Sequence, residues 1–253
     1  MLDYKNVEEF KSQCGYEIDG VWYPRVTKIV DIKSKPALYR FYGAMKSYQD
    51  AERMKEQSAI EGTLVHDTIE AILTGQEPSI PLLIKPSVDA FLKFLEDNSI
   101  EVQTQYVEYR LFHPTHRYAG TLDAIATIHG KTGILDIKTS QAIYRDYNLQ
   151  TSAYMAAMID KVPSLQARWI LRIDQNQKCL QCGAVLRTKG GNGKIRTQWN
   201  NYVMQTCAHE WGPARGLIEL KEFPFWENDF EAFLGAKRLW EWEHEEMLKK
   251  IGY

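Results

Sequence analysis

The chain has 253 residues and a net charge of −2, with 44% hydrophobic and 25% charged residues. This is the composition of a globular protein, and the length suits a single domain, 1–253. No run of about 18 apolar residues occurs, which excludes a transmembrane helix, and the polar N-terminal residues lack the apolar core of a signal peptide. We therefore expect a soluble, cytoplasmic protein without a membrane partner. The near-neutral total does not exclude a nucleic-acid partner, because a basic surface can exist locally within it.

The first part of the chain predicts a hairpin followed by helices. An Asp-Gly pair within residues 16–26 lies between aromatic and β-branched residues, a typical hairpin signal. Pro36 indicates the start of a helix in the basic segment that follows. Residues 46–73 have the periodic apolar stripe of a helix, which Gly75 ends. A second amphipathic helix is predicted over residues 87–98.

The remaining elements alternate between strands and helices. Residues 101–112 predict a strand. After the hairpin described next, residues 148–159 predict a helix. Residues 167–174 and 217–223 predict two strands that pair with each other. A last helix, from about residue 228 to 250, has an apolar side and many glutamates outside.

Asp123 and Asp136 lie on the two adjacent strands of a hairpin predicted by β-branched runs and a Gly-containing turn. Alternate residues of a strand share a face, so Asp136 and Lys138 project to one side and Ile137 to the other. Burying charged groups on a strand costs folding free energy, which indicates that they have a functional role. Two close carboxylates repel unless they share a proton or a cation, and oxygen ligands suit Mg²⁺ or Mn²⁺. This arrangement is the first indication of a site.

Four short motifs combine residues of this kind along the chain. They are Gly62-Thr-Leu-Val-His66, Gly120-Thr-Leu-Asp123, Asp136-Ile-Lys138 and Gln150-Thr-Ser-Ala-Tyr154. Together they resemble the PD-(D/E)XK nuclease superfamily in its RecB-like branch, which carries all four in this order. The segment 23–27, Tyr-Pro-Arg-Val-Thr, is also similar to phage and mitochondrial-type exonucleases. The resemblance covers roughly residues 16–174 and 217–250.

The resemblance implies a metal site and its chemistry. Asp123 and Asp136 would be ligands of Mg²⁺ or Mn²⁺, with His66 and the Ile137 carbonyl as further ligands. Lys138 would act on the attacking water and offset developing negative charge.

The resemblance also implies supporting residues and a fold. Gln150 and Tyr154 would orient the lysine and contact the DNA backbone. Glu70, which shares a helix face with the histidine four residues earlier, and Glu108 are candidates for supporting the ligands from outside. By itself, Glu108 is more simply interpreted as an exposed charge. The implied fold is mixed α/β (α+β), a central mixed sheet flanked by helices with a restriction-endonuclease-like core.

Residues 175–216 depart from the family because they form a long insertion between two core strands. Cys179, Cys182, Cys207 and His209 predict a small zinc-finger-like module, since three cysteines and one histidine form a known structural zinc set. One alternative is that these thiols are free. The other is an iron–sulfur cluster with Cys14 as the fourth thiolate. Against it, three of the cysteines lie between two core strands, and His209 offers a closer fourth ligand.

The insertion is also basic, with six basic residues against one acidic residue. Cationic groups neutralise phosphates and aromatic rings stack on bases, so the insertion is a candidate guide for DNA. The candidate contacts are Arg187, Lys189, Lys194, Arg196 and Trp199. The alternative is a solvated loop whose aromatic residues pack only on each other.

These motifs favour a metal-dependent deoxyribonuclease, most simply an exonuclease on single-stranded DNA or DNA ends, in replication, recombination or repair. Its partner would be DNA, with a recombination or replication protein as a second candidate. Two alternatives remain open: an endonuclease of the same fold, and a DNA-binding accessory protein without catalytic activity.

Overall fold

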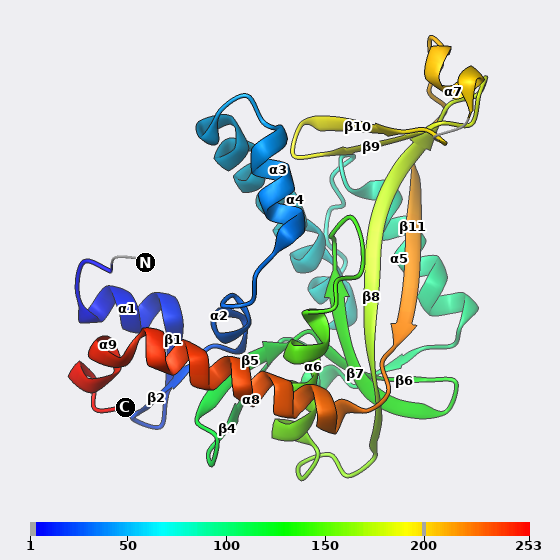
Figure 1. Ribbon diagram of the computed structural model, residues 1–253. Coiled ribbons are helices and arrows are strands. Elements are labelled where there is room, and N and C mark those ends of the chain that lie inside the picture. Colours follow the sequence, from blue (N-terminus) through cyan, green and yellow to red (C-terminus); the bar gives the residue numbers. More distant parts are fainter. Residues whose placement is uncertain (1–3, 199–200) are drawn as a thin grey trace.

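The computed structural model describes residues 4–198 and 201–253, and its centre is a mixed β-sheet flanked by helices (Figure 1). The strands run in the order β10-β9-β8-β7-β6-β3, and β11 also pairs with β8. Strands β7 and β8 are parallel, whereas the other pairs are antiparallel. The strands are β3 (Glu101–Val102), β6 (Ala124–Ile128), β7 (Lys131–Lys138), β8 (Leu165–Lys178), β9 (Val185–Lys189), β10 (Asn192–Arg196) and β11 (Arg215–Glu222). The predicted mixed α/β class with a central mixed sheet is confirmed.

Two hydrophobic cores lie on opposite faces of this sheet, because its buried strands carry apolar side chains on both sides. On one face, α4 (Tyr48–Leu73) and α5 (Lys85–Asp97) contribute Ile69 and Phe91, packed with Ile137 of β7. On the other face, α6 (Tyr147–Met158) and α8 (Trp226–Glu243) contribute Met155 and Phe233, packed with Ile134 of β7. The alternation along β7 therefore sends Asp136 to the side of α6.

Two small hairpins extend the second core. They are formed by β1 (Gly15–Ile18) with β2 (Val21–Pro24), and by β4 (Tyr109–His113) with β5 (Tyr118–Leu122). A bridge between Arg25 and Ala119 joins them. The remaining helices are α1 (Val7–Cys14), α2 (Val26–Val30), α3 (Pro36–Ala44), α7 (Tyr202–Thr206), α9 (Glu245–Lys250) and the 3-10 turn η1 (Thr104–Tyr106).

Three predicted elements are interrupted in the structure. The strand predicted over 101–112 divides into β3, η1 and β4, because the chain leaves the central sheet to form a separate hairpin. The strand before the predicted turn divides at Asp123 into β5 and β6, which pair with different partners. The last helix divides at His244 into α8 and α9.

The turn between β6 and β7 is confirmed, and its conformation explains its sequence. His129 and Gly130 form a two-residue turn with φ of 49° and 78°, and Ile128 pairs with Lys131. Positive φ at both central residues is the requirement of a type I′ turn, which matches the twist of the flanking strands. The hairpin predicted from this segment is therefore β6–β7 alone.

Arg168 on β8 holds α6 against the sheet. Its side chain is 1% exposed and donates to the Asn148 carbonyl (2.6 Å) and the Thr151 hydroxyl (3.2 Å) of α6. It also donates to the Phe223 carbonyl (3.2 Å) and forms an ion pair with Asp229 near the start of α8. A buried cation is tolerated because these acceptors satisfy it.

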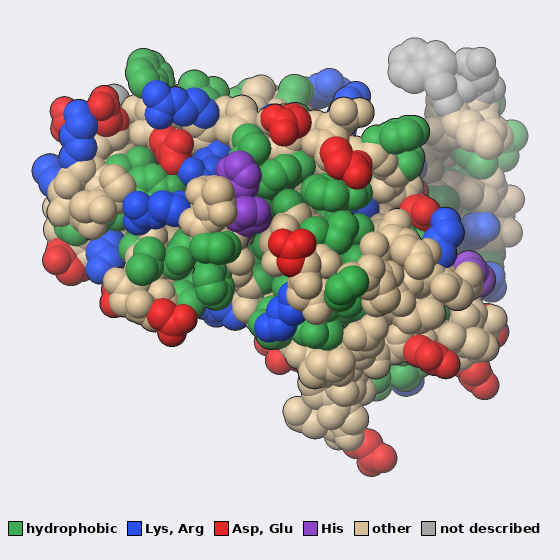
Figure 2. Space-filling view, turned by 90° about the horizontal axis from the view of Figure 1, so that it is seen from below, with side chains coloured by type: hydrophobic (Ala, Val, Ile, Leu, Met, Phe, Trp, Pro, Cys, Tyr) green, Lys and Arg blue, Asp and Glu red, His purple; other side chains and the backbone are tan. Residues whose placement is uncertain are grey.

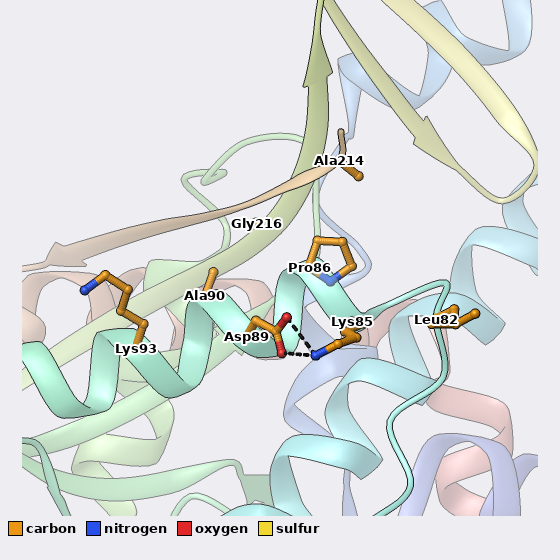
Figure 3. Close-up of a pocket in the computed structure, with 8 residues that line it drawn as sticks. All are labelled: Leu82, Lys85, Pro86, Asp89, Ala90, Lys93, Ala214 and Gly216. Atoms are coloured by element: carbon orange, nitrogen blue, oxygen red, sulfur yellow. Dashed lines mark hydrogen bonds and ion pairs between the residues drawn. The ribbon is translucent and has the colours of Figure 1, made fainter. Parts of the chain in front are cut away.

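On the other face, β11 passes very close to α5. A Cβ at Gly216 would lie 2.0 Å from the Pro86 carbonyl oxygen, so only glycine fits at this crossing. A cavity of about 510 Å³ lies beside it, and Lys85 on its wall is paired with Asp89 at 2.8 Å (Figure 3). The wall offers no cluster of metal-ligating side chains among the described residues, so it is not the candidate site.

On the face seen from below, acidic, basic and hydrophobic side chains are mixed, without an extended patch of one charge (Figure 2). None of the helices within residues 4–198 and 201–253 combines the length and apolar character needed to cross a membrane.

Candidate metal-binding active site

Three potential ligands meet where α4 approaches the two hairpins. His66 on α4, Glu108 before β4 and Asp123 between β5 and β6 have ligand atoms within 4.8 Å of one another. They line a cavity of about 320 Å³, to which Asp67 and Glu70 also contribute. Three distant parts of the sequence thus assemble a set of oxygen and nitrogen donors.

Asp136 and Lys138 lie beside this cluster, on the side of β7 that faces α6. The Asp136 side chain is fully buried, and its Oδ2 lies 2.7 Å from Lys138 Nζ. Gln150 Nε2 donates to Asp136 Oδ1 (3.0 Å) and to the Tyr154 hydroxyl (3.0 Å). Asp123 Oδ2 accepts a hydrogen bond from the Ile137 amide (2.5 Å), which connects the two halves of the site.

Two glycines of the motifs allow the elements of the site to pack closely. A Cβ at Gly120 would lie 2.5 Å from Tyr154 Cε1, so α6 can reach this strand only across a glycine. A Cβ at Gly62 would lie 2.9 Å from the Thr139 hydroxyl, so the absence of a side chain at this residue lets α4 approach the end of β7. The glycines of the first two motifs therefore permit the close packing that brings histidine and carboxylates together.

Several acidic groups lie near one another at the site, where Asp136 is fully buried, Asp123 is half-buried and Glu108 is exposed. Partial desolvation, followed by the neighbouring Asp123, Glu70 and Asp67, raises the pKa of Glu108 to about 7. Burial also raises the pKa of Asp123, and it raises that of Asp136 to about 6 against the opposing effect of Lys138.

The cationic groups of the site respond in opposite directions. Burial, assisted by Lys138, lowers the pKa of His66 to about 4, so the imidazole is neutral and can act as a ligand. Burial opposes the charge of Lys138, but Asp136 and Asp123 raise its pKa above the ordinary value. Lys138 therefore carries its charge beside the carboxylates.

The structure changes the rank of two predicted residues. Glu108, which the sequence left between an exposed charge and a supporting group, is exposed and at the same time belongs to the three-residue ligand cluster. Its backbone is left-handed (φ 48°), and its amide donates to the Asp123 carbonyl at 3.0 Å. Glu70 lines the cavity but lies outside that cluster. At Ile137, the amide donates to Asp123, and the role of its carbonyl as a metal ligand stays a prediction.

A second cluster forms in the insertion. Ligand atoms of Cys179, Cys182, Cys207 and His209 lie within 4.8 Å of one another, so this set can hold a metal such as zinc. The thiols of Cys179 and Cys207 are 3.8 Å apart, and Cys182 Sγ is 3.4 Å from His209 Nδ1. Cys14 does not join them, because it lies in the core beside Tyr4. The cluster thus contains three thiols and an imidazole, not four thiols.

The basic residues of the insertion divide into two groups. Arg187 donates to Asp174 (2.7 Å), and both Arg187 and Lys189 donate to the Thr139 carbonyl at the end of β7. These two predicted DNA contacts are engaged within the protein. Lys194 and Arg196 are exposed on β10. Trp199 lies outside the described residues.

Sequence reasoning missed Tyr16 and Arg110 at the cavity, and it gave no role to two residues within its motifs, Arg25 and Thr121. Tyr16, Arg25 and Thr121 line the cavity together with His66, and Arg110 stacks on Tyr16. The alternation of Thr121 and Asp123 along one chain segment was the available signal for Thr121. Tyr16 and Arg110 meet only through the tertiary fold.

Comparison with known proteins gives no family for this chain. No protein-family model matches it, and no curated protein matches it. The functional argument therefore depends on the geometry of the two clusters and on the sequence motifs.

Proposed function

We propose that this protein is a metal-dependent deoxyribonuclease that hydrolyses phosphodiester bonds. The observation that carries the proposal is the cluster of His66, Glu108 and Asp123 in an open cavity, directly beside the buried Asp136–Lys138 pair. The sheet β6–β7–β8 with α6 would then be a restriction-endonuclease-like core, as the resemblance of the four motifs suggests.

The donor set fits a hard divalent cation. Asp123 and Glu108 offer carboxylate oxygens and His66 offers a neutral nitrogen, a combination that suits Mg²⁺ and tolerates Mn²⁺. Asp136 lies beside this cluster and would act as a further ligand, as the resemblance implies. When bound, such a cation would offset negative charge on a phosphate group and make water more acidic. The cavity leaves room for a phosphate between these ligands and solvent.

The remaining residues of the site would stabilise negative charge on the phosphate and hold Asp136 in position. The charged Lys138 amine lies 2.7 Å from Asp136, where it can donate to a water molecule or to a phosphate oxygen that gains negative charge. Gln150 fixes the orientation of Asp136 by hydrogen bonding, and Tyr154 holds Gln150 in turn. Geometry fixed in this way reduces reorganisation during the reaction.

We favour exonuclease action on single-stranded DNA or DNA ends, because the motifs resemble those of end-processing exonucleases. Its setting would be replication, recombination or repair.

The test uses linear DNA labelled at either end and circular DNA, each single- and double-stranded, incubated with Mg²⁺ or Mn²⁺. Degradation of the linear forms alone indicates an exonuclease. Cleavage of circles indicates an endonuclease. Binding without cleavage in either metal would replace the proposal with an accessory DNA-binding role.

Variants at one strand provide a matched comparison. Asp136→Asn and Lys138→Met should each lower the cleavage rate by about 100-fold or more, because they remove preorganised charge at the reacting phosphate. Lys131→Met, at the exposed start of the same strand, should cleave at the wild-type rate. Equal activity of Lys138→Met and Lys131→Met would overturn the assignment.

Glu108 and Glu70 allow a test of the ligand set itself. Both carboxylates line the cavity, but only Glu108 belongs to the ligand cluster. Mn²⁺ affinity, measured by electron paramagnetic resonance, should fall by about 10–100-fold in Glu108→Gln and much less in Glu70→Gln. Equal losses in both variants would remove Glu108 from the ligand set.

A further inference from the structure

A tyrosine lies between two arginines at the rim of the candidate active site. The Arg110 guanidinium carbon is 3.7 Å from the centre of the Tyr16 ring, and that of Arg25 is 4.3 Å from it. Guanidinium groups stack on aromatic faces in this way, which fixes their plane and position. Two oriented cations therefore lie on Tyr16, at the edge of a cavity whose lining includes four carboxylates.

The two arginines have different amounts of free hydrogen-bonding capacity. Arg25 donates to the backbone carbonyls of Gly15 (3.2 Å) and Ser12 (2.9 Å), so it connects the end of the N-terminal hairpin to its first strand and to α1. Arg110 is exposed and donates through Nε to the Thr121 hydroxyl (3.2 Å). Within the described residues, its two terminal nitrogens have no hydrogen-bonded protein partner. They form a fork directed by Tyr16 and Thr121.

The position of this fork relative to the metal ligands is set by the strand. Arg110 pairs with Thr121 in the β4–β5 register, and Thr121 and Asp123 both line the cavity. Two residues of extended chain span about 6.6 Å. The Arg110 side chain is thus anchored one such step from a ligand of the proposed metal. Successive phosphates of an extended nucleic-acid strand are separated by a comparable distance.

We propose that Arg110, supported by Tyr16, binds the backbone phosphate next to the one that is cut. This inference rests on the proposed nuclease function and adds a specificity to it: the substrate is a polynucleotide strand that presents at least two neighbouring phosphates. A planar fork suits a phosphate because two parallel N–H donors match its oxygens. Arg110 is therefore a substrate-positioning residue, whereas Arg25 is its structural support.

The first test separates substrate positioning from general charge. Arg110→Gln should raise the KM for a single-stranded oligonucleotide about tenfold, with a smaller change in kcat, and should reduce the slope of log affinity against log salt by about 1. Arg110→Lys should recover only part of the loss, because a lysine keeps the charge but lacks the fork. Arg238→Gln, which removes an exposed arginine of α8, should behave as wild type. Equal effects of Arg110→Gln and Arg238→Gln would refute the assignment.

The second test identifies the phosphate. Oligonucleotides would carry one uncharged methylphosphonate, placed in turn at each position around the cleaved bond. At the position adjacent to that bond, the methylphosphonate should raise the KM of the wild type about as much as Arg110→Gln does. The two changes together should raise the KM no further. If the wild type cleaves these oligonucleotides but the two effects on KM add at every position, the inference is overturned. Failure of the wild type to cleave any DNA would instead overturn the proposed function.

Discussion

Gly120→Ala probes the contact on which the geometry of the candidate active site depends. The added Cβ would lie 2.5 Å from Tyr154 Cε1, whereas ordinary contact begins at 3.4 Å, so the ring or the strand must shift by the difference, about 0.9 Å. Tyr154 is 1% exposed and packs within the second core, so it has little room to move. Overpacking of this kind costs about 1–3 kcal/mol of unfolding free energy.

The shift should also reach the metal ligands. Gln150 bonds both to the Tyr154 hydroxyl and to Asp136, so movement of the ring disturbs the carboxylate. We expect Gly120→Ala to lower the melting temperature by about 2–10 °C and to weaken Mn²⁺ binding measurably. Differential scanning calorimetry and electron paramagnetic resonance provide the two measurements.

Gly235→Ala is the matched control. Gly235 lies within α8, and a Cβ there would meet no atom within 4 Å. Alanine in a helix interior should stabilise the protein by about 0.5–1 kcal/mol and leave Mn²⁺ binding as in the wild type. If Gly120→Ala melts at the wild-type temperature and binds Mn²⁺ equally well, the close packing of Tyr154 on this strand is wrong.

Two further predictions concern stability and the insertion. Asp229→Asn should lower the unfolding free energy by about 3 kcal/mol, since it leaves Arg168 buried without its counter-charge, whereas the exposed Glu227→Gln in the same turn should cost less than about 1 kcal/mol in urea unfolding. Elemental analysis should find one zinc ion per chain in the wild type and in Cys14→Ser, but a large loss of zinc in Cys182→Ser; iron with visible absorbance, or equal zinc in both variants, would contradict the Cys₃His assignment.

The local parts of the fold could be predicted because they depend on short stretches of chain. The helix that carries His66 follows from its apolar period, and its end follows from Gly75, whose φ is 81°. The β6–β7 hairpin follows from its turn residues. The placement of Asp136 and Lys138 on one face follows from the two-residue period of a strand, and the observed ion pair agrees with it.

Other features could not be predicted because they depend on contacts between distant segments. Glu108 joins the ligand cluster because its own left-handed backbone turns the chain towards β4, where the Glu108 amide donates to the Asp123 carbonyl. Arg187 and Lys189 appeared available to DNA from composition alone, yet the β9–β10 hairpin directs them to the carbonyl of Thr139. Charge counting cannot distinguish a solvated cation from one with an internal partner.

The sequence by itself determined which chemical groups are present and in what local arrangement: the four motifs around the two aspartates and the lysine, and the Cys/His donors of the insertion. The tertiary structure decided which groups meet. It added Glu108 to the candidate ligand cluster, excluded Cys14 from the Cys/His cluster and placed Arg110 against Tyr16. The physical reason is that periodicity and turn chemistry act over a few residues, whereas these contacts require strand pairing and packing across the whole chain.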